Sequence, residues 1–411
     1  GISTVLTGNE WIGWMNDLII FVLLVGILLH NFAQDAGWNF GKYLAEIVAA
    51  VCGAVCFIGK PFADGGAFYR SKKTGESHAG WYVLIGICAA VPCLMVLVLL
   101  LMSADMVFAD LLVRFAGVFR FPVKLFRILL MLVFGFLSSY CGVRYVQKHA
   151  ADIKPSAGKT AEPLIAIAFT APIAVLYLLF SAIQIVYLFI GNMQLPVGVT
   201  YAEYARRGFF QLLFVCVLNL VAVLSIQNYF KENRVLKALL LTISSCTLVM
   251  TASSACRMLL YIRAYQLTFL RVSVLVALAV IALLMAGVIA KIVKPQFPLL
   301  RYGFVLAGTV YLVFAFSHVD YFIAAYNLTH TSWEASGEET VDYSYLYTLS
   351  TDAAPAIEKY AGKNGASDYR TQGWYRLYCE ANEAALNGTG VRTYNVSHAV
   401  AKQLLMEDNR E

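Results

Sequence analysis

Apolar residues dominate this chain in a series of long stretches from Trp11 to about Ala324. Roughly nine such stretches are separated by short, charged connections, and the pattern ends after Ala325. A helix rises about 1.5 Å per residue, so about 20 apolar residues are needed to cross roughly 30 Å of hydrocarbon. The longer stretches meet that length. The pattern therefore predicts an all-α fold, a polytopic helical membrane bundle followed by a water-soluble C-terminal tail.

The predicted bundle covers residues 1–324 and contains nine membrane-spanning segments. These lie near 12–30, 43–59, 81–102, 125–146, 163–191, 209–227, 238–256, 272–293 and 302–324. Segment 43–59 is short and carries Glu46, so a re-entrant segment or one packed against other helices is an alternative there. Residues 103–122 alternate apolar and charged positions with a helical period, which predicts an amphipathic helix lying in the membrane interface.

The tail, residues 325–411, is predicted to be a small, mainly helical soluble domain. Capping and stop signals indicate helices over Asp352–Ala361, Thr371–Leu386 and Ser397–Met406. Tyrosine and tryptophan are frequent in this part of the chain, and we expect them to form a small aromatic core.

Composition supports the membrane class, because 60% of the residues are hydrophobic and only 14% are charged. Up to Ala324, 24 Lys and Arg stand against 13 Asp and Glu, a net charge of +11, whereas the tail has 7 against 12, a net charge of −5. Basic residues beside apolar stretches are typical of topology signals and contacts with anionic headgroups. We expect membrane lipids as partners, a protein partner for the tail, and no nucleic acid.

The basic connections also predict an orientation. Four of them fall on one side of a nine-span bundle, namely 60–80, 147–161, 228–237 and 291–301. That side should be cytoplasmic, although the opposite connections carry Lys and Arg as well. The tail is then extracytoplasmic, and a miscount of one span would invert everything after it.

Motifs for common chemistries are missing from the sequence. Eight of the nine cysteines lie in apolar stretches, so no disulfide framework can be built. Gly158-Lys159-Thr160 ends like a phosphate-binding loop, but Ile153 stands where its first glycine is needed. We predict no catalytic residue, metal or cofactor. Gly1 carries no initiator Met, and we expect further sequence upstream.

Charged residues gather at one predicted edge of the bundle. Arginines there would cost free energy at a bilayer boundary unless they pair, meet water or bind an anion. The interpretations are a pocket for an anionic group, or a network that fastens helices together. The candidate residues are Glu203, Arg206, Arg207, Arg257, Arg263 and Asp320. The seventh predicted span is rich in Ser and Thr, which indicates close helix packing or a hydrated path.

Two motifs carry a resemblance to a known family. They are Thr200-Tyr-Ala-Glu-Tyr-Ala-Arg-Arg-Gly-Phe-Phe-Gln-Leu-Leu213 and the run from Ser254-Ala-Cys-Arg to Phe-Leu-Arg271. The chain resembles, over roughly residues 160–360, a family of bacterial multi-pass membrane proteins described only as a domain of unknown function. The likeness extends to Tyr345-Leu-Tyr-Thr-Leu-Ser-Thr-Asp-Ala-Ala-Pro355. The resemblance implies a bacterial plasma or inner membrane location and supplies no activity.

Three functions remain open at this stage. We favour a non-enzymatic sensor, regulator or assembly component, because a small domain carried by a bundle with few deep ionisable groups suits recognition. The alternative is a transporter of a small anionic or lipid-linked substrate that uses the arginine-rich pocket. A membrane-embedded transferase is a third possibility, and the absence of a credible acid/base pair counts against it.

Overall fold

The computed structural model describes residues 1–33, 38, 40–57, 59–61, 63–65, 67, 123–149, 159, 161–186, 201–330, 332–333, 339–340, 343–364, 369–387 and 394–407. The predicted span 81–102 and the predicted amphipathic helix 103–122 lie outside these residues. Contacts divide the chain into two compact units. One unit comprises Gly1–Phe21 with Ala157–Glu411, and the other comprises Val22–Ser156.

The unit Val22–Ser156 is built around two helices, α3 (Phe40–Cys56) and α7 (Val123–His149), which pack on each other. Gly53 makes the close approach possible, because a Cβ at this position would overlap the ring of Tyr145. The chain enters this unit through α2 (Glu10–Phe32), a helix whose first part belongs to the other unit.

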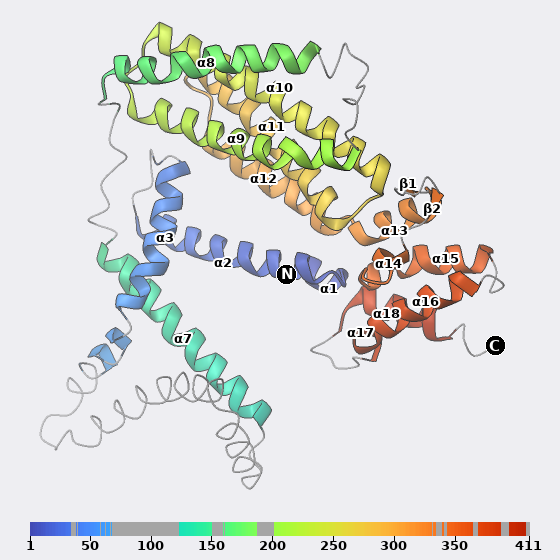
Figure 1. Ribbon diagram of the computed structural model, residues 1–411. Coiled ribbons are helices and arrows are strands. Elements are labelled where there is room, and N and C mark those ends of the chain that lie inside the picture. Colours follow the sequence, from blue (N-terminus) through green and yellow to red (C-terminus); the bar gives the residue numbers. More distant parts are fainter. Residues whose placement is uncertain are drawn as a thin grey trace, which may run out of the picture. The chain divides into compact units, whose positions relative to one another are not determined.

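The other unit contains a bundle of five long helices that lie side by side (Figure 1). They are α8 (Pro163–Ile185), α9 (Tyr201–Tyr229), α10 (Arg234–Tyr265), α11 (Phe269–Val293) and α12 (Leu299–Phe316). α10 packs against α8, α9 and α11, and it contributes many buried residues to the bundle core.

Six helices in the described part of the chain are long and apolar enough to cross a membrane. They are α2, α8, residues Phe209–Tyr229 of α9, α10, α11 and α12. Large apolar side chains remain exposed on them, such as Leu164 on α8 and Val313 on α12. Water solvates such a surface poorly, so lipid is its natural environment. The predicted class, a helical membrane protein, is confirmed.

The predicted span 302–324 is interrupted in the structure. α12 ends at Phe316, and a separate helix, α13, covers Val319–Thr329. The break has a local cause, since His318 adopts a left-handed conformation with φ 47°, which a continuous right-handed helix cannot contain. The predicted boundary between bundle and tail, after Ala324, falls within α13.

After α13 the chain forms a short antiparallel strand pair and then a group of small helices. The elements are β1 (Ser332–Trp333), β2 (Glu339–Thr340), α14 (Tyr343–Leu346), the 3-10 turn η2 (Thr351–Ala353), α15 (Ala354–Asn364), α16 (Tyr369–Ala381), α17 (Glu383–Asn387), α18 (Val396–Lys402) and a π-helical turn (Gln403–Glu407). The predicted helix Thr371–Leu386 is divided between α16 and α17, and α15 continues past Gly362.

One hydrophobic cluster joins α13 to these small helices. Ile323 of α13 is fully buried there together with Leu346, Ile357 and Tyr378. Trp374 stacks on Tyr343 within the same cluster, with ring centroids 5.2 Å apart. Helices α14 to α18 therefore share a core with the helix that directly follows α12, and Figure 1 shows them gathered at one end of the bundle.

Candidate functional site

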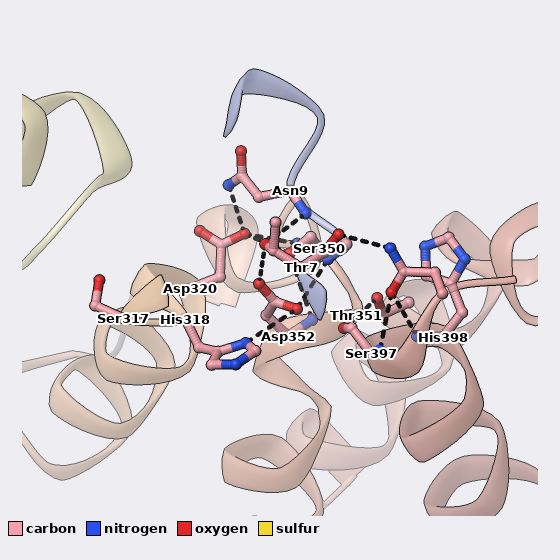
Figure 2. A network of polar contacts seen from close by, with 12 residues as sticks. Thr7, Asn9, Ser317, His318, Asp320, Ser350, Thr351, Asp352, Ser397 and His398 are labelled. Carbon is pink, nitrogen blue, oxygen red and sulfur yellow. Dashed lines mark hydrogen bonds and ion pairs between the residues drawn. The ribbon is translucent and has the colours of Figure 1, made fainter. Parts of the chain in front are cut away.

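The most extensive polar network in the described residues joins the two ends of the chain. We call residues 1–9 the N-terminal segment; its helix α1 (Ile2–Leu6) packs on α18 and α12. The Thr7 hydroxyl donates to Asp352 Oδ2, and the Gly8 amide donates to Asp352 Oδ1 at 2.9 Å (Figure 2). Asn395 Nδ2 donates to the carbonyl oxygens of Thr4 and Thr7, at 3.1 and 2.7 Å.

Asp320 stands at the centre of this network, in the first turn of α13, and is 2% exposed. Its Oδ2 accepts three hydrogen bonds, from Asn9 Nδ2 at 2.9 Å and from the amide and hydroxyl of Ser350 at 3.2 and 2.6 Å. Asn9 also accepts from the Ile12 amide through Oδ1, at 3.2 Å, and so caps α2. A single carboxyl group therefore joins the start of α2, the start of α13 and the tail. We call this network the acidic junction.

Three further titratable groups, His318, Tyr378 and His398, surround the two aspartates. His318 Nδ1 lies 3.6 Å from Asp352 Oδ1, and the Tyr378 hydroxyl donates to the Ser350 carbonyl at 2.8 Å. Burial raises the pKa of Asp320 and of Tyr378, whereas it lowers the pKa of His398. At Asp320, hydrogen bonds from Ser350 and Asn9 lower the pKa and so oppose the effect of burial, whereas the nearby charge of Asp352 raises the pKa further.

A second set of contacts fastens α13 to the turn between α10 and α11. The Asn327 side chain accepts from the Leu267 amide and donates to the Leu267 carbonyl, both at 2.9 Å. Gln266, which has a positive φ of 64°, donates from Nε2 to the His330 carbonyl at 2.6 Å. The hydroxyl of Tyr345 accepts from the Phe269 amide at 2.8 Å. The end of α10 and the start of α11 are thus bonded to the tail through main-chain groups.

The structure distributes the sequence-predicted site residues over several places. Glu203, Arg206 and Arg207 lie in the first turns of α9, and their side chains are outside the description. Arg263, in the last turn of α10, is exposed. Asp320 belongs to the acidic junction, where it is hydrogen-bonded to Asn9 and Ser350.

Arg257 lies in the interior of α10 and makes a contact with α8. Its Nη2 donates to Gln184 Oε1 at 3.4 Å, and Ser253 Oγ donates to the same oxygen at 2.8 Å. The bundle contains another chain of polar contacts, in which the Tyr177 hydroxyl donates to Asn219 Oδ1 and Asn219 Nδ2 donates to Thr247 Oγ1. Part of the Ser/Thr-rich α10 thus serves to hydrogen-bond neighbouring helices.

The acidic junction is suited to holding chain segments together. Three of its four aspartate oxygens, both of Asp352 and Oδ2 of Asp320, receive donors, and donors satisfy a carboxylate without a bound cation. Among the described residues, no group of three or more His, Cys, Asp or Glu could hold a metal ion. The arrangement can dock chain segments on one another, and its titratable groups can exchange protons.

Sequence reasoning found Asp320 but missed its partners. Asn9, Ser350 and Asn395 each precede a helical element and accept amide hydrogen bonds from its first turn. Such capping residues are recognisable in a sequence. Their meeting is not, because the bond between Asn9 and Asp320 joins positions 311 apart.

The fold and the acidic junction define a helical membrane protein whose N-terminal segment is docked on its C-terminal tail. The chain belongs to the family described as "Domain of unknown function (DUF4153)", whose model matches residues 1–360. The resemblance seen in the sequence is thereby confirmed. No curated protein and no solved structure gave a match.

Proposed function

We propose that this protein is a non-enzymatic membrane sensor or regulator in which the tail responds to, or reports on, the arrangement of the membrane helices. The observation that carries the proposal is the position of Asp320. Its carboxyl group is bonded both by the residue that caps the first apolar helix and by Ser350 of the tail. A displacement of α2 relative to α12 therefore acts directly on the tail.

The bonds between Asn327 and Leu267 support the same function. They attach the tail to the connection between α10 and α11, so a change inside the bundle has a second route to the tail. Helix caps and turns transmit such displacements because their hydrogen bonds depend on direction as well as distance. The net charge of −5 on the tail favours a basic protein surface as its partner.

The test is hydrogen–deuterium exchange of the full-length protein in lipid nanodiscs. Asn395→Asp removes the donor that holds the N-terminal segment, and it retains an oxygen that can cap α18. If the tail and the bundle are coupled, exchange must rise in the N-terminal segment and also in α13 and in the turn at Gln266–Thr268. Arg376→Gln, on the exposed face of α16, is the matched control. An increase confined to residues 1–9 would contradict the proposed coupling.

We also propose a topology of eight crossings in place of nine. Asn9 directly precedes α2, and Asp320 closely follows α12, and the two side chains are hydrogen-bonded at 2.9 Å. Contacting residues lie on the same side of a membrane, which requires an even number of crossings between them. Candidate spans α2 and α8 to α12 supply six, so the region between α2 and α8 must supply an even number.

Of the nine predicted membrane-spanning segments, segment 43–59 is the one that we propose does not cross the membrane. The corresponding helix, α3, has 17 residues, which is the lower limit of the length that a perpendicular crossing needs. Without it, Lys42 joins the basic connections 60–80, 147–161, 228–237 and 291–301 on one side. This improved charge asymmetry supports a cytoplasmic assignment for that side and an extracytoplasmic location for both the N-terminal segment and the tail. The membrane would be the bacterial plasma or inner membrane.

Thiol labelling tests this topology. An impermeant reagent is applied to spheroplasts that produce Ile2→Cys, with labelling of Cys379 followed in parallel by peptide mapping. Ile2 is 75% exposed, and both sites should react before lysis. Lys294→Cys, in the exposed connection between α11 and α12, should react only after lysis. Labelling of position 2 only after lysis would restore an odd number of crossings.

A second candidate function is transport of a small anionic or lipid-linked substrate. The observation in its favour is the shared contact of Arg257 and Ser253 with Gln184 in the bundle, where a guanidinium and hydroxyl groups lie together. Thermal unfolding against a panel of anions, lipids and headgroup analogues tests it. A ligand at a hundred times its Kd should add about 2.7 kcal/mol of stability, and Arg257→Ala should abolish the gain. Unchanged melting with every compound would exclude this function.

A further inference from the structure

The two oxygens of Asp320 have different surroundings. Oδ2 receives all three hydrogen bonds of the group, from Asn9 and from Ser350. Oδ1 is completely buried and has no hydrogen-bond partner among the described residues. A carboxylate in that position carries negative charge on an oxygen that is buried from bulk solvent and has no donor among the described residues, which is costly. A neutral carboxyl group, with its proton on Oδ1 and Oδ2 as the acceptor, fits the same geometry at lower cost.

Asp352 makes ionisation of Asp320 harder still. The Asp352 side chain is fully buried, and both of its oxygens accept hydrogen bonds, from Thr7 and Gly8. Two buried carboxylates in one network repel each other. His318 Nδ1 contacts Asp352 Oδ1 from the position directly before α13 (Figure 2). The charge of Asp352 also acts on His398 of α18, and the hydroxyl of Tyr378, in α16, donates to the Ser350 carbonyl.

The N-terminal segment supplies donors to both aspartates. Asn9 donates to Asp320, and Thr7 and Gly8 donate to Asp352. Gly8 lies so close to the tail that a Cβ would overlap Thr351 Oγ1 and come within 3.2 Å of Ser397 Oγ. Docking of the segment therefore completes the burial of the two carboxyl groups, and undocking would open them to water.

We propose that a proton is the ligand of the acidic junction, and that its binding to Asp320 holds the N-terminal segment on the tail. This inference rests on the proposed function and names the signal that controls it. Protonation leaves a single negative charge in the docked junction. Deprotonation adds a second one, and release of the segment hydrates both. The N-terminal segment is then docked at low pH and released at high pH, in response to the pH on the side of the membrane that the tail occupies.

The direction of the pH response follows from linkage. Burial raises the pKa of Asp320 in the docked state above its ordinary value near 3.8. Docking is therefore strongest below that ordinary value and weakens as the pH rises through the raised pKa, by up to about tenfold per pH unit. His398 acts in the opposite direction, because burial lowers its pKa and acid then favours release. His398→Gln removes this opposing response.

The experiment measures hydrogen exchange of the peptide that contains the Gly8 amide, in full-length protein in nanodiscs over a series of pH values. Rates are corrected for the intrinsic pH dependence of exchange. In His398→Gln, protection should fall by up to about tenfold per pH unit above the ordinary pKa of an aspartate and then level off. Adding Asp320→Asn, which mimics the neutral carboxyl group, should keep protection at its acid level throughout.

Ser350→Ala is the second variant, and its effect has a distinctive sign. It removes the hydroxyl donor from Asp320 Oδ2, a bond of 2.6 Å that favours the carboxylate. The pH at which protection stops falling and levels off should therefore be higher in this variant. A merely structural loss would instead lower protection equally at every pH. This variant keeps the inference testable if the Asp320→Asn protein fails to fold.

The possible failures are distinguishable. A pH response that survives Asp320→Asn would belong to another group of the junction and would overturn the proposal. Protection that is constant over pH, while Asn395→Asp still releases the segment, would overturn proton control and leave the docking function intact. Absence of protection at Gly8 in the wild-type protein at every pH would remove the proposed docking itself.

Discussion

Asn395 performs two separable tasks, and separating them tests how the N-terminal segment is held. Its Oδ1 accepts from the amides of Ser397 and His398, at 2.8 and 3.3 Å, and so caps α18. Its Nδ2 donates to the carbonyls of Thr4 and Thr7. Asn395→Ala removes both tasks. Asn395→Asp preserves the cap, because aspartate is an equally good capping residue, but it cannot donate.

The expected magnitudes follow from the lost bonds. Removing the cap costs about 1 kcal/mol of helix stability. Each lost hydrogen bond to a carbonyl costs about 1 kcal/mol, so the two bonds to the segment contribute about 2 kcal/mol, or roughly 30-fold in the docking equilibrium. Asn395→Asp should therefore increase exchange of the segment about 30-fold with little change in α18. Asn395→Ala should release the segment similarly and also loosen α18.

The assay is hydrogen–deuterium exchange with mass spectrometry, read separately for the peptide that covers residues 1–9 and for the peptide that covers α18. Reclosing must be fast relative to the intrinsic exchange of an open amide for the ratio of rates to report the equilibrium. Wild-type protection of the segment in Asn395→Asp would refute the reasoning, because it would mean that the two Nδ2 bonds contribute nothing to docking.

Three further predictions concern the bundle and the tail. Gly287→Ala should destabilise the protein by about 1–3 kcal/mol in thermal unfolding, because the new Cβ overlaps the ring of Tyr302; Gly308→Ala, which meets nothing within 4 Å, should be neutral or slightly stabilising. Asn219→Leu should cost about 1 kcal/mol in chemical unfolding, since it breaks the bonds that connect α8, α9 and α10. Burial lowers the pKa of His398, so the wild-type melting temperature should decrease as the pH falls through about 6.5, and His398→Gln should show a smaller decrease.

The helices of the bundle were predictable because hydrophobic length is a strong signal. Predicted spans 163–191, 238–256 and 272–293 correspond to α8, α10 and α11, with ends that differ by several residues. The break at His318 was not predictable from hydropathy, since Ser317 and His318 interrupt the apolar pattern no more than other polar residues do. A left-handed residue there is a property of the tertiary structure, which outweighs the local preference for a continuous helix.

The candidate site, like the fold, was predictable from the sequence only in part. The electrostatic cost of a charge near the membrane made Asp320 a candidate residue in need of partners. The sequence suggested arginines as those partners, because opposite charges are the usual solution. The structure instead provides an amide and a serine, Asn9 and Ser350, whose donors come from helix caps. Neutral donors of this kind cannot be recognised from the distribution of charged residues along the sequence.

The separation of 345 positions between Thr7 and Asp352 constrains how the protein is made. The N-terminal segment is synthesised before the residues that hold it, and the apolar helices α2 and α8 to α12 are synthesised in between. During that interval the start of α2 has no tail to dock on. Closure of the acidic junction is thus among the last steps of biogenesis, and a quality-control protease that recognises an exposed N-terminal segment would distinguish unfinished chains from finished ones.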